Sequence, residues 1–162
     1  MRMQLFILIT CINLMACMST VSTCINDRTI GTILRWGDGD MKSGLYQGYE
    51  LHAEDVSLYS IKKAQGNEAM TINRVDSVGA SVFCSRLGDI IETFTAIQSL
   101  YSPGQTYRSI EYINTKTNVH KKAIWNPEFS TFGSKEFRAL HDSLMVLVSA
   151  STHGILQNNG KK

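Results

Sequence analysis

Residues 107–125 read YRSIEYINTKTNVHKKAIW, and this stretch decides the fold that the sequence predicts. β-Branched, aromatic and apolar residues are frequent in Tyr107–Ile113 and again in Val119–Trp125, and the polar run Asn114–Asn118 separates them. Two such segments joined by a short polar connection are typical of a β-hairpin. Pro127 follows the second segment, and proline ends a strand because it lacks the N–H group that a sheet uses. We therefore predict an antiparallel hairpin here.

Four stretches before this hairpin also have the composition of strands. β-Branched and aromatic residues are frequent in residues 29–36, 45–52 and 56–63, and a weaker candidate covers residues 70–75. The Gly-Asp-Gly-Asp sequence at residues 37–40 ends the first of them as a turn. Only a short polar connection separates the second and third stretches, so another hairpin is the simplest interpretation.

Apolar residues that recur at a spacing of three and four predict two helices. The first helix is expected from Arg86 to Tyr101, with Ser85 as its N-cap and the sequence Ser-Pro-Gly at residues 102–104 after its end. The second helix is expected from about Ser134 to about Ser149. The predicted fold is an α+β domain, with an antiparallel sheet of about five to six strands and two helices packed on one face.

The N-terminus carries a second strong pattern. An apolar stretch, Leu5–Leu14, follows the single basic residue Arg2, and it ends in the tetrapeptide Leu14-Met15-Ala16-Cys17. This pattern resembles the lipobox of bacterial lipoprotein precursors. The resemblance implies cleavage before Cys17, a diacylglycerol on its sulfur and location in the cell envelope. Met18 is not acidic, which in that family favours the outer membrane, facing the periplasm, when the host is Gram-negative. An ordinary cleaved secretory signal is the alternative interpretation.

The domain organisation follows from these two patterns. We predict a signal peptide at residues 1–16, a tether at 17–28, a single α+β domain at 29–150 and a flexible polar tail at 151–162. The tether is rich in Ser, Thr and Asn and has no sustained periodicity. About 140 residues after the signal can bury one core, so a second domain is not expected.

Two cysteines remain in the mature chain when Cys17 carries lipid. Cys24 and Cys84 form an even pair in a compartment outside the cytosol, where disulfides form and persist. A disulfide between them would attach the N-terminal segment to the domain. The alternative is two unpaired cysteines, and the sequence leaves both possibilities open.

Composition and motifs argue against several classes of function. The formal net charge is +2, charged residues make up 19% of the chain, and the basic residues are scattered, so no nucleic-acid partner is predicted. The four histidines lack the spacing of a metal site, and each is expected to be a surface or half-buried structural residue. Ser60–Lys63 matches Ser-x-x-Lys, but it lies in a predicted strand without its companion motifs. We predict no cofactor and no catalysis.

The segment Ser43-Gly44-Leu45-Tyr46-Gln47-Gly48 carries a further resemblance. With the order of elements over roughly residues 29–148, it is similar to the emfourin type of small inhibitor domain, which binds thermolysin-like metalloproteases and carries Ser-Gly-Gly-x-Ala-Gly in its early strand region. Leu45 and Gln47 depart from that motif. The resemblance implies an α+β fold and partner binding at Ser43, Gly44 and Gly48. In the alternative interpretation the glycines only relieve crowding in a twisted hairpin.

Three functional hypotheses follow. The preferred one is a lipid-anchored envelope lipoprotein whose small domain binds an unidentified protein partner without catalysis, as an inhibitor or an immunity protein does. The second is a small envelope hydrolase or ligand-binding enzyme, with a site assembled from His120, Trp125, Tyr107 and Glu111. The third is a structural lipoprotein that tethers envelope layers through the basic end Gly160-Lys161-Lys162.

Overall fold

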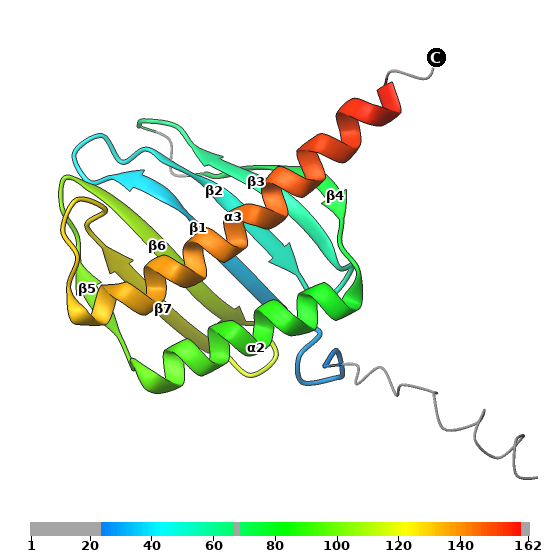
Figure 1. Cartoon of the computed structure of the whole chain (residues 1–162), viewed down its shortest axis with the longest axis horizontal. Helices are drawn as coiled ribbons and strands as arrows, with labels where there is room; N and C mark the ends of the chain where they lie inside the picture. Colours follow the sequence, from blue (N-terminus) through cyan, green and yellow to red (C-terminus); the bar gives the residue numbers. More distant parts are fainter. Residues whose placement is uncertain (1–23, 67–68, 160–162) are drawn as a thin grey trace, which may run out of the picture.

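A computed structural model describes residues 24–66 and 69–159 of the chain, and for residues 151–159 it describes the backbone alone. These residues form a seven-stranded sheet and two helices, shown in Figure 1. In chain order the elements are β1 (Thr32–Asp40), β2 (Tyr46–His52), β3 (Ser57–Lys63), β4 (Thr71–Ser77), α2 (Ala80–Ala96), β5 (Leu100–Ser102), β6 (Thr106–Asn114), β7 (Val119–Trp125) and α3 (Phe132–Asn159).

The sheet has the strand order β4-β3-β2-β1-β6-β7-β5. Every neighbouring pair is antiparallel except β5 and β7, which are parallel. The predicted α+β class is confirmed, but the predicted number of strands was wrong because residues 100–102 were assigned to the end of a helix or to its stop signal. A three-residue strand has no readable periodicity. It exists because β7 lies beside it, and the Asn126 N–H donates to the Ser102 carbonyl at 2.8 Å.

Both helices begin earlier than the sequence predicts. Helix α2 starts at Ala80, so Ser85 lies inside it, and the N-cap residue is Gly79, which has no side chain to accept a bond. Helix α3 starts at Phe132. Thr131 and Ser134 cap it reciprocally: each backbone N–H donates to the other's hydroxyl, at 2.8 and 3.2 Å. The helix then continues to Asn159, past the predicted end, through residues that include no proline.

One face of the sheet is covered by α2 and α3, which both cross it in Figure 1. Side chains alternate between the faces of a strand, so every second residue of β1 points toward the helices. The core between the layers contains Leu34, Trp36, Ile110, Trp125, Phe83, Phe94, Phe137 and Leu144, all at most 2% exposed. Burial of each such side chain contributes roughly 1.5–3 kcal/mol. The face that points away from the helices is called the open face below.

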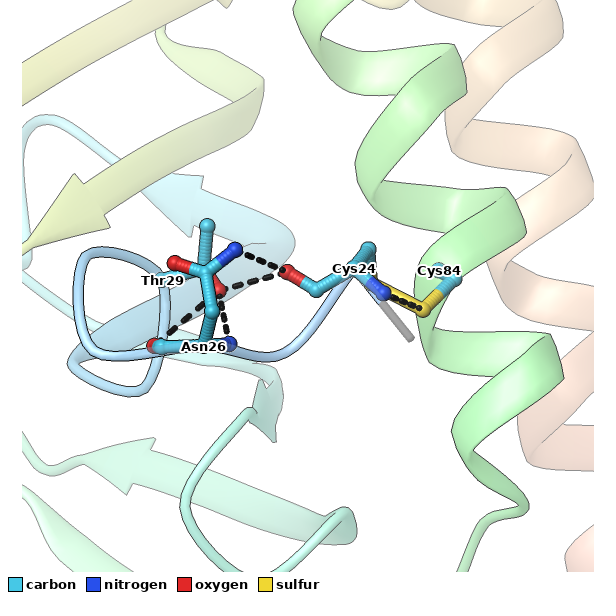
Figure 2. Close-up of a disulfide and its surroundings, with 4 residues drawn as sticks. All are labelled: Cys24, Asn26, Thr29 and Cys84. Atoms are coloured by element: carbon cyan, nitrogen blue, oxygen red, sulfur yellow. Dashed lines mark hydrogen bonds between the residues drawn. A yellow bond between two sulfur atoms is a disulfide. The ribbon is translucent and has the colours of Figure 1, made fainter. Parts of the chain in front are cut away.

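The N-terminal segment is attached to the domain at Cys24. Of the two alternatives for the cysteines, the structure has the disulfide, which joins Cys24 to Cys84 of α2 (Figure 2). Beyond it, the Thr29 hydroxyl donates to the Cys24 carbonyl at 2.5 Å, and Asn114 Nδ2 donates to the Arg28 carbonyl at 2.8 Å. These contacts hold residues 24–28, the end of the predicted tether, against the domain.

The proposed lipid site, Cys17, and its lipobox lie outside the described residues, as does the basic end at residues 160–162. Within the part of the chain that is described, neither helix is long and apolar enough to cross a membrane.

Candidate functional site

Side chains on the open face form rows across the sheet, because antiparallel register places residues of adjacent strands directly opposite one another. The middle row takes one residue from each strand between β7 and β4. In that order the row consists of Lys122, Glu111, Arg35, Glu50, Tyr59 and Arg74. Charge therefore alternates along its first four members, and we call it the charged row.

Arg35 is at the centre of the charged row. Its Nη2 lies 2.6 Å from Glu50 Oε1, and its Nε donates to the same oxygen at 2.7 Å. Its Nη1 lies 3.7 Å from Glu111 Oε2 on the other side. The planar guanidinium can direct several N–H groups at once, so it bridges carboxylates that two different strands supply.

Lys122 of the charged row and two neighbouring histidines bind the remaining carboxylate oxygens. His52 Nε2 lies 2.7 Å from Glu50 Oε2. On the other side, Glu111 has His120 Nε2 at 2.8 Å from Oε2 and Lys122 Nζ at 2.9 Å from Oε1. Both oxygens of each carboxylate therefore have a partner, as buried polar groups generally require.

Glu50 is only 1% exposed, although α2 and α3 both lie on the other face of the sheet. Burial alone would raise the pKa of this carboxyl, but the hydrogen bond with His52 and the charge of Arg35 outweigh burial, so its pKa lies below the usual value. Glu50 is therefore an anion at neutral pH. Removing one member of such a buried pair typically costs about 3–5 kcal/mol, because the other charge is left unpaired.

Glycines occupy the neighbouring positions on β1 and β2. Gly37 lies opposite Gly48, and a Cβ on Gly48 would collide with the Trp36 carbonyl oxygen. A Cβ on Gly39 would collide with the ring of Tyr107. Only glycine, which has no Cβ, allows β1 and β2 to approach this closely and the Tyr107 ring to lie against the β1 backbone.

Two tyrosines fill the space above these glycines. The rings of Tyr46 and Tyr107 stack with their centroids 6.4 Å apart, and the Tyr46 hydroxyl lies 3.3 Å from Ser109 Oγ. Burial raises the pKa of the Tyr46 phenol above its ordinary value, so this side chain is neutral. Two hollows of about 540 and 260 Å³ adjoin the tyrosines, and both are also lined by Asp40 and Lys63.

The three residues predicted to bind a partner differ in exposure: Ser43 is half-buried, Gly44 is exposed and Gly48 is buried. Ser43 donates its backbone N–H and its hydroxyl to Asp40 Oδ1 at 2.6 and 2.8 Å, and these bonds lower the pKa of Asp40. Gly44 is exposed, has a φ of 69° and lines the smaller hollow. Gly48 is buried, so its position matches the alternative interpretation, in which glycine relieves crowding between strands. Partner binding at Ser43, Gly44 and Gly48 stays a prediction.

Of the four residues proposed for a hydrolytic site, Tyr107, Glu111 and His120 lie near one another on the open face, but Trp125 does not join them. Trp125 is 1% exposed on the helix-covered face, where its ring stacks on Phe137 at a centroid distance of 6.1 Å. Glu111 and His120 point to the open face and contact each other, and Tyr107 lines the hollows. The sheet itself therefore separates the tryptophan from the acid and the histidine.

His141 was expected at the surface or half-buried, and this prediction was wrong. It is 2% exposed on the side of α3 that faces the sheet, with its ring edge-on to Trp125 at a centroid distance of 5.9 Å. Its Nδ1 lies 3.8 Å from Asp142 Oδ1, too far for a hydrogen bond. Burial lowers its pKa, so His141 is a neutral packing residue at neutral pH.

Sequence reasoning missed the charged row, although part of its signal was present. Arg35 alternates with the apolar residues Leu34 and Trp36, and Glu50 and His52 are two positions apart, so each set falls on a predictable face. Which strand pairs with which cannot be read from that alternation. The row needs β1 between β2 and β6, which only the topology supplies.

The chain matches no protein-family model and no curated protein. Among the residues that the structure describes, no three His, Cys, Asp or Glu side chains are grouped as a metal site.

Proposed function

We propose that this protein is a lipid-anchored bacterial envelope lipoprotein whose α+β domain binds a protein partner through the open face of its sheet, without catalysis. The observation that carries the binding role is the charged row. Arg35, Glu50 and Glu111 are held by mutual contacts before any partner arrives. Side chains that are already ordered lose little conformational entropy on binding, which favours recognition of a second surface.

The composition of the open face supports a protein as the partner. Tyrosine and arginine are enriched at protein interfaces, because they offer apolar contact area together with hydrogen-bonding groups. Arg35, Tyr59 and Tyr107 are partly exposed on this face. Inhibition of a protease and neutralisation of a toxin are the two specific versions of this role.

Two observations support location in the envelope. The lipobox-like sequence ending in Cys17 favours export and lipid attachment, with the outer membrane, facing the periplasm, favoured in a Gram-negative host. The Cys24–Cys84 disulfide fits an oxidising compartment outside the cytosol. The lipid would insert two acyl chains, each at about 0.8 kcal/mol per buried CH₂, enough for a stable anchor.

The anchor is tested by labelling cells with an alkyne-bearing fatty acid. Cys17→Ser should abolish the label and release processed protein from the membrane fraction. The matched control is the double variant Cys24→Ser/Cys84→Ser, which should keep the label. Equal labelling of wild type and Cys17→Ser would remove the lipoprotein assignment.

The binding role is tested by cross-linking with an amine-reactive reagent in intact cells. Lys122 lies on the open face, and Lys135 lies on α3. Lys122→Arg should lose the cross-link to an envelope protein while keeping its charge, and Lys135→Arg should retain it. Recovery of no partner, together with measurable turnover of a small substrate by the purified protein, would contradict the proposal.

A further inference from the structure

In the charged row, the basic side chains are more exposed to solvent than the acidic ones. The side chains of Glu50 and Glu111 are 2% and 5% exposed, whereas that of Lys122 is 40% exposed. Arg35, which contacts both acids, is 21% exposed. A molecule that approaches the open face therefore meets the cations first, while the carboxylates lie beneath them.

The same asymmetry continues along the open face. Register places Lys63 on this face of β3 and Arg74 on this face of β4. Among the strand residues that the structure describes, register assigns the carboxylates Glu50 and Glu111 to the open face. Asp40, the last residue of β1, also lines the smaller hollow beside Lys63 and Lys122, where its Oδ1 accepts hydrogen bonds from Ser43. Asp55, in the turn before β3, lies at the rim, where it accepts a hydrogen bond from the Tyr59 hydroxyl.

The buried acids therefore have a positional role. Glu111 holds the Lys122 ammonium at 2.9 Å and His120 Nε2 at 2.8 Å, so two long or rotatable side chains have fixed positions. The Lys122 donors are not used up by this contact, because an ammonium group has three N–H bonds to give. Lys122 can therefore donate to a second, external carboxylate with little further loss of side-chain entropy.

From this arrangement we infer that the open face recognises an acidic segment of its protein partner, with Asp or Glu side chains placed against Lys122, Lys63 and Arg74. The inference rests on the proposed function and names the chemistry of the partner. An anionic membrane is the less suitable occupant, because lipid-binding surfaces are typically clusters of four to eight basic residues. Here single cations are separated by carboxylates, tyrosines and isoleucines.

The test uses the mature lipoprotein in a non-ionic detergent and a fluorescent peptide of ten glutamates, with a ten-glutamine peptide as the uncharged comparison. Fluorescence anisotropy should show binding of the glutamate peptide only. Lys122→Gln should weaken that binding about two- to fivefold, the range expected for one exposed ion pair. Lys63→Gln/Lys122→Gln should weaken it about tenfold, and raising the salt to 0.5 M should weaken it further.

Lys121→Gln is the matched control, because it removes the same charge from the adjacent residue of β7. Lys121 points to the opposite face and lines a hollow with Phe94 of α2. Binding that falls equally in Lys121→Gln and Lys122→Gln would mean that net charge alone attracts the peptide, and the inference would fail. Failure of the glutamate peptide to bind wild type would also overturn it.

Two further arms separate this inference from the proposed function. In nanodiscs of phosphatidylglycerol, protection of Lys122 from amine labelling that is not seen in phosphatidylcholine would assign the face to lipid and overturn the inference. A partner protein retained equally by Lys122→Gln and wild type would leave the proposed function intact but refute recognition by charge. Glutamate peptide binding that responds to Lys122→Gln but not to Lys121→Gln supports the inference even if no protein partner is recovered.

Discussion

Removal of the Cys24–Cys84 disulfide should lower the stability of the domain, and the length of the chain loop that the bond closes determines by how much. The bond joins residues 60 apart in sequence. In the chain-entropy model, a closed loop of this length restricts the unfolded chain by the equivalent of about 4 kcal/mol. Since small domains are stable by only about 5–15 kcal/mol, this is a large fraction of the total. The corresponding fall in melting temperature is about 10–20 °C.

The native state should change little when the bond is removed. Residues 25–31 keep other attachments, including the bond from Asn114 to the Arg28 carbonyl and the bond from Thr115 N–H to the Gly31 carbonyl at 3.0 Å. The effect should therefore arise mainly in the unfolded state. A freer unfolded chain exposes more surface, so the denaturant dependence of the unfolding free energy should become steeper.

The assay is guanidinium unfolding of Cys24→Ser/Cys84→Ser, followed by tryptophan fluorescence. Trp36 and Trp125 are both at most 1% exposed, so their emission should shift to the red on unfolding. Wild type in dithiothreitol should match the double variant, and dithiothreitol should not affect the variant. Ser85→Ala, an exposed change beside Cys84, is the control and should stay within about 0.5 kcal/mol of wild type. An unfolding midpoint of the double variant equal to that of oxidised wild type would refute the loop-closure reasoning.

Three other predictions concern packing, protonation and a loop. Gly48→Ala should destabilise the domain by about 1–3 kcal/mol, because the new Cβ collides with backbone atoms. Gly88→Ala has open space around it in α2 and should stabilise the domain by about 0.5–1 kcal/mol. Both changes are measured from guanidinium midpoints, and a shift of both midpoints in the same direction would contradict the role given to Gly48. The pKa of buried His141 is lowered below 6.5, so the unfolded chain binds more protons below that pH, and stability should fall as the pH drops from 7.5 to 5. The charged groups that face His141 are Asp38, Arg108 and Asp142. His141→Phe should reduce the loss of stability between pH 7.5 and pH 5, and an unchanged pH dependence would exclude His141 as its cause. Arg138→Met should lower the free energy of unfolding by about 2 kcal/mol, because the guanidinium donates to the carbonyls of Asn126, Pro127 and Phe129 at 2.6–2.9 Å. An unchanged thermal midpoint would show that the loop between β7 and α3 does not need those bonds.

Local patterns in the sequence determined the elements that are long and periodic. The hairpin of Tyr107–Ile113 and Val119–Trp125 agrees with β6 and β7 to within one residue, because strand composition and the polar turn are both local signals. The two helices were found for the same reason, although their starts were misplaced. Helix α2 begins after Gly79, which has no side chain for a cap, and α3 begins at the mutual capping of Thr131 and Ser134, upstream of the predicted start.

Tertiary structure alone decided the features that join distant parts of the chain. Strand β5 exists only because β7 lies beside it, and the disulfide, which the sequence left open, forms because α2 lies beside Cys24. The charged row is of the same kind. The sequence by itself places Arg35, Glu50 and Glu111 on alternating positions of three strands, and this fixes only the face of each strand on which they lie. Their contact requires β1 to pair with β2 on one side and β6 on the other, and strand order depends on the sum of long-range packing, which no local pattern records.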